Sequence, residues 1–387
     1  MNGKNDINTI YLDWAATAPR DREIIKKAVD LDAAAFGNPS SIHNEGKKAT
    51  ALLSEARERA ASALKVKQEK IFFTSGGTES NHIPLLSLLL KPSPGSIIVS
   101  GGEHPSIINQ CNVLKNRGWK VECVNPGKDG KLSPERISEK ISTGTALVLV
   151  QAVNNETGAI QPVKEISETI RQFSGCGRTI KFHVDGVQAA GKIPVDLNTW
   201  DPDSFSVSGH KLGAMRGTGL IYVKNNPENF LKGGEQESGF RPGTENVAGA
   251  YSLALALEKH MNNMEEFSLG KQMAGEFITG LKKIKGALII PENREPESCE
   301  YSPWIIQAAF ASIPGEVMVR SLAEKGICIS TGSACSSKKN SRPVLLAMGI
   351  PPETARNGVR FSFGPATKRE EILLTLEALK EITARFN

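Results

Sequence analysis

The chain has few cysteines and few aromatic residues among its 387 positions. Its six cysteines, at positions 111, 123, 176, 299, 328 and 335, include no CxxC pair and no spacing typical of metal ligands, so no metal site is predicted. We expect a reducing compartment in which most of these cysteines are buried free thiols. Aromatic residues make up 6% of the chain and do not alternate with basic ones, which argues against nucleic-acid binding.

Long apolar runs and a strong net charge are also missing. The first twenty residues contain no basic-then-apolar pattern, and no stretch approaches the roughly 20 apolar residues of a membrane span. We therefore expect a cytoplasmic protein without a membrane partner. The formal charge of +5 is mild and the basic residues are scattered, while 39% apolar and 23% charged residues are ordinary for a globular protein.

Apolar, β-branched segments alternate with helical patterns through the first 223 residues. Helical patterns occupy 105–118, 133–141 and 162–173. Several of the apolar segments are continuous, as in strands covered on both faces. The alternation predicts the α/β class, with a mostly parallel, seven-stranded, doubly wound sheet. The predicted strands are 71–74, 96–99, 121–124, 146–150, 181–184, 205–207 and 219–223.

A different pattern fills the rest of the chain. An amphipathic stretch over about 246–283 predicts two helices. Further strands and helices predict a smaller α+β domain, so that a large domain covers 17–259 and a small one covers 1–16 plus 260–387. The further strands are 287–291, 305–311, 327–331 and 358–363, and the helices are 315–325 and 368–385.

A lysine ends one apolar segment, in the sequence Ser208-Gly209-His210-Lys211. An amine with small polar neighbours is what a Schiff base with pyridoxal phosphate requires. Asp185 lies in an earlier, otherwise apolar segment, where an ionised carboxylate needs a partner. A protonated pyridine nitrogen would be such a partner, and a salt bridge to an arginine is the alternative. The pairing of Lys211 with Asp185 predicts a cofactor enzyme.

The segment 74–81, Thr-Ser-Gly-Gly-Thr-Glu-Ser-Asn, follows a predicted strand and opens a helix. Its glycines let the backbone approach an anion, and the first N–H groups of the helix with the Thr78 hydroxyl form a phosphate cup. No Gly-Lys-Ser/Thr follows, so this is not a Walker loop. A capped glycine-rich turn is the alternative, but beside Lys211 the segment predicts the seat of the cofactor phosphate.

Polar residues follow two other strands. His104, before Pro105, is suited to lie on a planar cofactor and to move protons, although a simple turn is the alternative. Asn155 lies in Asn154-Asn155-Glu156 after the strongest strand, at the edge of the sheet where ligands bind in α/β proteins. An asparagine-rich turn is the competing interpretation there.

Cys335 differs from the other cysteines because it lies in a run of small residues, 330–337, followed by Lys338, Lys339 and Arg342. A thiol in such a loop is accessible, and nearby cations favour the reactive thiolate. We therefore predict that Cys335 is a nucleophile. Inert packing is the alternative, and we assign it to Cys328.

Arg360 lies in a predicted alternating strand, Gly358-Val359-Arg360-Phe361-Ser362. A planar guanidinium is suited to bidentate recognition of a substrate carboxylate. An edge-strand arginine in solvent is the alternative.

Taken together, these motifs resemble those of the cysteine desulfurases, the NifS/IscS-like group of the class V aminotransferase superfamily, with the pyridoxal-phosphate fold of type I. Matching segments span nearly the whole sequence in the same order. They are 11–13, 15–17, 36–41, the Thr78 loop, 103–104, 154–156, 183–188, 208–211, 241–244, 332–335 and 360–362.

The resemblance implies specific roles. Lys211 holds the cofactor and moves protons at the substrate, and Cys335 takes the sulfur of L-cysteine as a persulfide, leaving L-alanine. Asp185 pairs with the pyridine nitrogen, and His104 stacks on the ring. The remaining implied contacts are Gln188 and Asn155 at the phenolic oxygen, Gly77, Thr78, Ser208 and His210 at the phosphate, Thr244 at the phosphate of a second subunit, and Arg360, Asn155 and Asn38 at the substrate carboxylate.

The resemblance also implies partners: a second copy of the chain in a homodimer, and a sulfur-acceptor protein such as an iron–sulfur scaffold, for cluster assembly or thiolation. The Cys335 context resembles the group with a longer catalytic loop. Gly77, Trp14 and the residues 338–342 depart from common family patterns. A selenocysteine lyase, another pyridoxal-phosphate enzyme such as an aminotransferase, and a non-catalytic scaffold are the alternatives.

Overall fold

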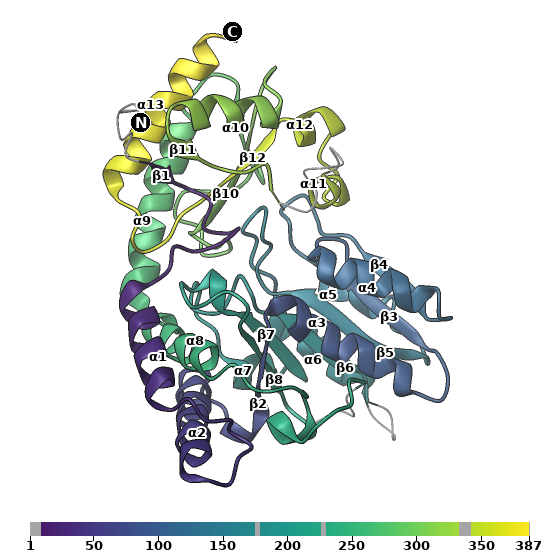
Figure 1. Ribbon diagram of the computed structural model, residues 1–387. Coiled ribbons are helices and arrows are strands. Elements are labelled where there is room, and N and C mark those ends of the chain that lie inside the picture. Colours follow the sequence, from purple (N-terminus) through teal and green to yellow (C-terminus); the bar gives the residue numbers. More distant parts are fainter. Residues whose placement is uncertain (1–8, 175–178, 226–229, 333–341, 387) are drawn as a thin grey trace.

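The computed structural model of the protein describes residues 9–174, 179–225, 230–332 and 342–386 (Figure 1). Cys335, the predicted nucleophile, and Cys176 lie outside the described residues. Among the residues that are described, no helix combines the length and the apolar character needed to cross a membrane.

The larger sheet consists of β2 (Ile71–Thr74), β3 (Ser96–Ser100), β4 (Lys120–Val124), β5 (Thr145–Gln151), β6 (Lys181–Asp185), β7 (Ser204–Ser208) and β8 (Gly219–Val223). Their order across the sheet is β2-β8-β7-β6-β5-β3-β4. Strand β8 is antiparallel to both neighbours, and the other adjacent pairs are parallel. The predicted α/β class with a mostly parallel, seven-stranded sheet is confirmed.

Helices cover both faces of this sheet. They are α3 (Gly77–Leu86), α4 (Pro105–Lys115), α5 (Pro134–Ser138), α6 (Val163–Phe173) and α7 (Leu197–Trp200). On β3, Ile97 packs in one cluster with apolar residues of α3 and α4. The next residue, Ile98, belongs to the main core with residues of α5 and α6. Because successive side chains of a strand point to opposite faces, the continuous apolar segments are explained.

Three helices lie together beside the seven-stranded sheet in Figure 1: α1 (Arg22–Ala34), α2 (Asn44–Leu64) and α8 (Val247–His260). The sequence patterns did not predict α1 and α2. The buried face of α2 consists largely of alanine, including Ala49, Ala56 and Ala60, so its apolar periodicity is weak. Helix α8 is followed by α9 (Met264–Leu281), which confirms the two helices predicted over 246–283.

The remaining elements are β1 (Ile10–Tyr11), β9 (Ala287–Ile290), β10 (Ile305–Phe310), α10 (Gly315–Glu324), β11 (Ile327–Cys328), α11 (Pro343–Ala347), α12 (Pro352–Arg356), β12 (Gly358–Ser362) and α13 (Arg369–Ala384). An antiparallel sheet has the order β12-β10-β9, and β1 pairs with β11. This sheet packs on α9, where the rings of Phe277 and Phe361 lie 4.9 Å apart. The domain boundaries at 16/17 and 259/260 stay a prediction.

The cysteines differ from the expectation. Those in the described part of the chain are free, but only Cys111 is buried. Cys123 is exposed because it lies on β4, the edge strand of the large sheet, and Cys299 is exposed beside the amine of Lys271. Cys328 is half-buried on β11.

Candidate active site

A cavity of about 240 Å³ lies where β6 and β7 end. Asp185 is the last residue of β6 and Ser208 the last residue of β7. The carboxyl ends of parallel strands meet at one edge of a sheet, which is where ligands bind in open α/β folds. Most of the predicted site residues therefore gather here, and those lining the cavity are Gly77, Thr78, His104, Asn155, Asp185, Gln188, Ser208, His210, Lys211 and Arg360.

Lys211 ends a short 3₁₀ turn that directly follows β7. Its Nζ donates to the carbonyl oxygens of Ala15 and Ala16, at 2.6 and 2.7 Å. The backbone N–H of Ala15 in turn donates to Ser362 Oγ of β12. A primary amine is thus held at the cavity wall by the N-terminal segment, which the three-stranded sheet anchors.

Asp185 is buried and accepts several hydrogen bonds. Its Oδ2 accepts from Asn81 Nδ2 at 2.8 Å, and its Oδ1 accepts from the Val187 N–H at 3.0 Å. The predicted alternative, a salt bridge to an arginine, is not what the described residues form around this carboxylate. Donors on both oxygens hold this carboxyl group in place at the cavity, where it can pair with a cation.

Beside Asp185, Asn81 also lines the cavity, with His183 bonded behind it, and the sequence analysis assigned a site role to neither residue. Asn81 Nδ2 serves Asp185, so Asn81 Oδ1 must accept from His183 Nε2 at 3.0 Å. His183 Nδ1 then accepts from Ser204 Oγ at 2.8 Å. Burial lowers the pKa of His183 to about 3, so this imidazole stays neutral. Asn81 lies one helical turn after Thr78, and that spacing is a signal that could have identified it.

His104 both faces the cavity and caps α4. Its Nδ1 accepts from the Ser106 N–H at 3.1 Å, so the ring proton is on Nε2. Burial lowers the pKa of His104, and the nearby charge of Lys211 acts in the same direction. The turn and the functional interpretations of this histidine are therefore compatible, because one nitrogen caps a helix while the ring stays neutral at the cavity.

The start of α3 provides backbone donors at the cavity. Gly76, its N-cap, has φ +147°, a conformation that favours glycine. A Cβ on Gly77 would lie 2.6 Å from Val187 Cγ2, which explains glycine at this position in this chain. His210, nearby, has a pKa lowered to about 4, chiefly by burial and then by the charge of Lys211. It stays neutral and retains an N–H to donate.

Arg360 is buried, with a side chain 2% exposed, and does not lie in solvent as the alternative predicted. Its strand β12 is buried along its whole length, so the predicted alternation is absent. One guanidinium nitrogen donates to Asp13 Oδ1 at 2.9 Å, and the other to the carbonyl of Asn155 at 2.8 Å. Its Nε finds no acceptor within the residues described. Two of the five guanidinium N–H groups are thus engaged, and Arg360 lines the cavity.

Glu103 is a further buried acid that the sequence analysis gave no role. Its Oε1 accepts from the Gln151 N–H at 2.5 Å. Burial, and then the charge of Asp185, raise the pKa of Glu103 well above its ordinary value. Both causes make a second negative charge beside Asp185 unfavourable.

Two predicted residues within the described part of the chain, Asn38 and Thr244, do not line the cavity. Asn38 is exposed, and its Oδ1 accepts from the Ser40 N–H. Thr244 is also exposed, and Cys335 lies outside the described residues. Arg342, predicted as a cation near Cys335, is buried, and burial lowers its pKa although Glu156 and Glu316 act in the opposite direction.

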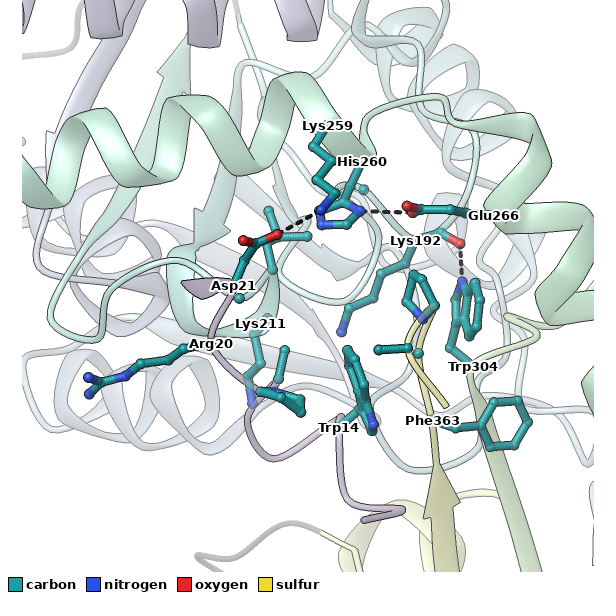
Figure 2. A pocket seen from close by; sticks show the side chains of 18 residues that line it. Trp14, Arg20, Asp21, Lys192, Lys211, Lys259, His260, Glu266, Trp304 and Phe363 are labelled. Carbon is teal, nitrogen blue, oxygen red and sulfur yellow. Dashed lines mark hydrogen bonds and ion pairs between the residues drawn. The ribbon is translucent and has the colours of Figure 1, made fainter. Parts of the chain in front are cut away.

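A second cavity, of about 320 Å³, adjoins the first at Lys211, which lines both (Figure 2). Trp14, Trp304 and Phe363 provide aromatic walls. Lys192, which the sequence analysis missed, also lines it, and its backbone carbonyl accepts from Trp304 Nε1 at 2.9 Å. Lys192 follows Gln188 by four residues, and its Nζ donates to Gln188 Oε1.

The residues present fit pyridoxal phosphate. The cofactor needs an amine for its aldehyde, an acid for its pyridine nitrogen and donors for its phosphate. Lys211 supplies the amine, the buried Asp185 the acid, and the start of α3 with Gly77 and Thr78 the donors. These groups meet in one cavity.

The comparisons with known proteins cover nearly the whole chain. The sequence profile of the family described as aminotransferase class-V matches residues 10–374. The cysteine desulfurases IscS of Clostridium botulinum and Dictyoglomus turgidum are 35% and 33% identical over 382 residues, covering 96% of this chain and 94% of each relative. A solved structure named NifS-like protein has a TM-score of 0.89 at 30% identity and covers 97% of this chain and 100% of that chain.

Proposed function

We propose residue roles from one premise: the chain belongs to the aminotransferase class-V family and, within it, to the cysteine desulfurases, as its motifs predicted. Enzymes of this group depend on pyridoxal phosphate and convert L-cysteine to L-alanine while passing on the sulfur. The observation that carries the residue roles is the gathering of Lys211, Asp185 and Arg360 around one cavity.

The proposed cofactor contacts follow from the chemistry of the cavity. Lys211 holds the cofactor covalently, Asp185 accepts from the pyridine nitrogen, and the neutral His104 lies on the ring. When bound, pyridoxal phosphate draws electrons from the substrate Cα and makes the Cβ–S bond labile. The phosphate is held by Gly77, Thr78, Ser208 and His210, and the phenolic oxygen by Gln188 and Asn155.

Lys211 is proposed to move the proton at the substrate Cα. The two carbonyls that hold its amine, from Ala15 and Ala16, give the released lysine a fixed place at the cavity wall. From there its nitrogen stays within the cavity, as a general acid or base must.

Arg360 is proposed to bind the substrate carboxylate. Asp13 and the Asn155 carbonyl orient the guanidinium plane but use only two of its five N–H groups, and the position of Arg360 at the cavity supports a contact between the others and a carboxylate oxygen. We assign the side-chain amide of Asn155 to the same carboxylate. Asn38 is exposed and does not line the cavity in this chain, and we assign its contact to the second subunit.

Cys335 is proposed as the sulfur acceptor. Its thiolate attacks the substrate Sγ, the Cβ–S bond breaks with its electron pair going to Cβ, and Cβ takes a proton to give alanine. The product on the enzyme is a Cys335 persulfide. The backbone of Ser330, five residues earlier, pairs with Arg360. Five residues span at most about 17 Å, which supports a thiol within reach of the substrate.

The test compares wild type with Cys335→Ala and with Cys123→Ala, a control at a cysteine that is exposed on β4. With L-cysteine and a reductant, wild type and Cys123→Ala release alanine and sulfide at equal rates. Cys335→Ala binds the cofactor, as its visible absorbance reports, but releases neither product. Equal rates for Cys335→Ala and wild type would refute the nucleophile.

We further propose a homodimer, a protein sulfur acceptor such as an iron–sulfur scaffold, and a cytoplasmic location. Phe36 and Ile42, 74% and 91% exposed, support an apolar contact between subunits near Asn38. Thr244 is exposed, as a residue reaching a partner's phosphate must be. Free thiols at the described cysteines support a reducing compartment. Sedimentation velocity of the holoenzyme tests the dimer. A species with the mass of one chain would refute it.

A further inference from the structure

The side-chain amide of Gln188 has both of its ends engaged by neighbours. Its Nε2 donates to the Ala15 carbonyl at 2.9 Å, and its Oε1 accepts from Lys192 Nζ at 2.5 Å. A carbonyl cannot donate, and an ammonium cannot accept. If the amide were turned over, its oxygen would face the Ala15 carbonyl oxygen, and its N–H groups would face the ammonium of Lys192. Neither pair can form a hydrogen bond. The chemistry of these neighbours determines which end of the amide faces which way.

The amine of Lys192 lies in an unfavourable place for a cation. Burial, and then the charges of Lys211 and Arg360, lower the pKa of Lys192 well below its ordinary value. Its hydrogen-bond partner is a neutral amide and not a carboxylate. Because burying a lysine amine is unfavourable, its presence here indicates that the N–H groups of Lys192 have a role. This role does not depend on the charge of Lys192 alone, because a neutral amine also donates. The Ala15 carbonyl can only accept, so it always faces the N–H side of the amide.

The position of Gln188 connects this arrangement to the cavity. Gln188 lines the first cavity, whereas Lys192 lines the second, and Figure 2 draws Lys192 near Trp14 and Trp304. The amide nitrogen has two N–H groups, and one of them serves Ala15. With Oε1 held by Lys192, the other N–H is left for a group in the first cavity.

We propose that Lys192 is a positioning residue, which turns the Gln188 amide so that its second N–H donates to the phenolic oxygen of pyridoxal phosphate. This inference rests on the proposed cofactor role of Gln188. A donor at the phenolic oxygen favours the form of the bound cofactor that has lost a proton. Removing Lys192 should therefore raise the pH at which that proton is lost.

The experiment measures the bound cofactor directly. For wild type, Lys192→Met and Lys192→Arg, the visible absorbance is titrated with pH, and the affinity of the apoprotein for pyridoxal phosphate is measured by tryptophan fluorescence. Lys192→Met should raise the pH midpoint by about one unit and weaken cofactor binding about tenfold. Lys192→Arg, which can only donate, should restore both values. If Lys192→Met does not fold, Lys192→Gln replaces it, with smaller shifts in the same direction.

Two comparisons isolate the proposed route through Gln188. Lys259→Met is the matched control, because Lys259 lines the second cavity but pairs with Asp21, and it should change neither readout. In a Gln188→Ala background, Lys192→Met should cause no further shift. An equal shift in that background would mean that Lys192 acts through its charge alone, and would overturn the inference.

The outcomes separate this inference from the proposed function. A wild-type protein that binds no pyridoxal phosphate would refute both. A wild type that binds it normally, with Lys192→Met unchanged in midpoint and affinity, would refute only the role of Lys192.

Discussion

The two ends of the active-site cavity are held in different ways. At the Asp185 end, helix α3 and the turn after β6 supply partners to the two carboxylate oxygens, and His183 holds Asn81 from behind. At the Arg360 end, the guanidinium is oriented by Asp13 and the Asn155 carbonyl, but its Nε finds no acceptor in the part of the chain described. We call the Asp185 end complete, because both of its oxygens have protein donors, and the Arg360 end open, because only two of the five guanidinium N–H groups have acceptors among the described residues.

This difference matches the proposed division between cofactor and substrate. A group that stays bound through many turnovers is served by a rigid, fully hydrogen-bonded acid. A substrate that enters and leaves is served by a pre-oriented cation with spare hydrogen-bonding capacity. Substitutions at the two ends should therefore change different kinetic parameters.

The largest effect is expected at the complete end. Asp185→Asn keeps the size of the side chain but removes the negative charge, so the cofactor loses the partner of its pyridine nitrogen. We expect the single-turnover rate of alanine formation to fall at least about 100-fold, with KM for L-cysteine little changed. Rapid-quench measurements with excess enzyme check the rate.

Asp196→Asn is the control for that substitution. Asp196 caps the short helix α7, and asparagine caps a helix as well as aspartate does, so wild-type kinetics are expected. A rate for Asp185→Asn within a few-fold of wild type would remove the distinction between the two ends.

An intermediate effect is expected at the open end. Arg360→Lys keeps the charge but loses the planar fork, and a hydrogen bond to a charged group contributes about 1.5–3 kcal/mol. KM for L-cysteine should rise about 10- to 100-fold, while cofactor binding stays as in wild type. Steady-state kinetics and absorbance titration measure the two quantities. Arg356→Lys, at an exposed position on α12, should be neutral. A loss of cofactor without a change in KM would contradict the assignment.

A change in stability, and not in turnover, is expected for the layer behind Asp185. The folded protein keeps His183 neutral down to a pH of about 3, whereas an unfolded histidine takes up a proton near pH 6.5. The unfolded state therefore binds more protons in this window, and stability falls as the pH is lowered from about 6.5 towards 3, by about 1.4 kcal/mol per pH unit for one proton. Denaturant unfolding measures the free energy of unfolding at each pH, and its slope against pH should be smaller for His183→Gln than for wild type. Parallel curves would show that His183 titrates normally.

The sequence predicted the Asp185 end better than the Arg360 end. Asp185, Ser208 and Lys211 follow the ends of apolar strands, so the strand pattern alone places them at one edge of the sheet. The same reasoning placed the Thr78 loop, because that loop also joins a strand to a helix. Local patterns were sufficient wherever the site is built from consecutive strand–helix connections.

The missed features depend on contacts between distant segments. The bond of Arg360 to Asp13 joins residues 347 positions apart, and no local pattern indicates it. Lys192 was overlooked because a lysine in a turn usually lies in solvent. The exposure of Cys123 was also not foreseen, since it depends on which strand is at the edge of the sheet.

The central claim is that Cys335 takes the sulfur of a cysteine activated at Lys211. The most direct measurement is mass spectrometry of the holoenzyme after brief exposure to L-cysteine, without reductant. We predict an addition of about 32 Da on the peptide containing Cys335, absent from the Lys211→Ala variant. Alanine formation with an unmodified Cys335 peptide, or the same addition in Lys211→Ala, would contradict the account.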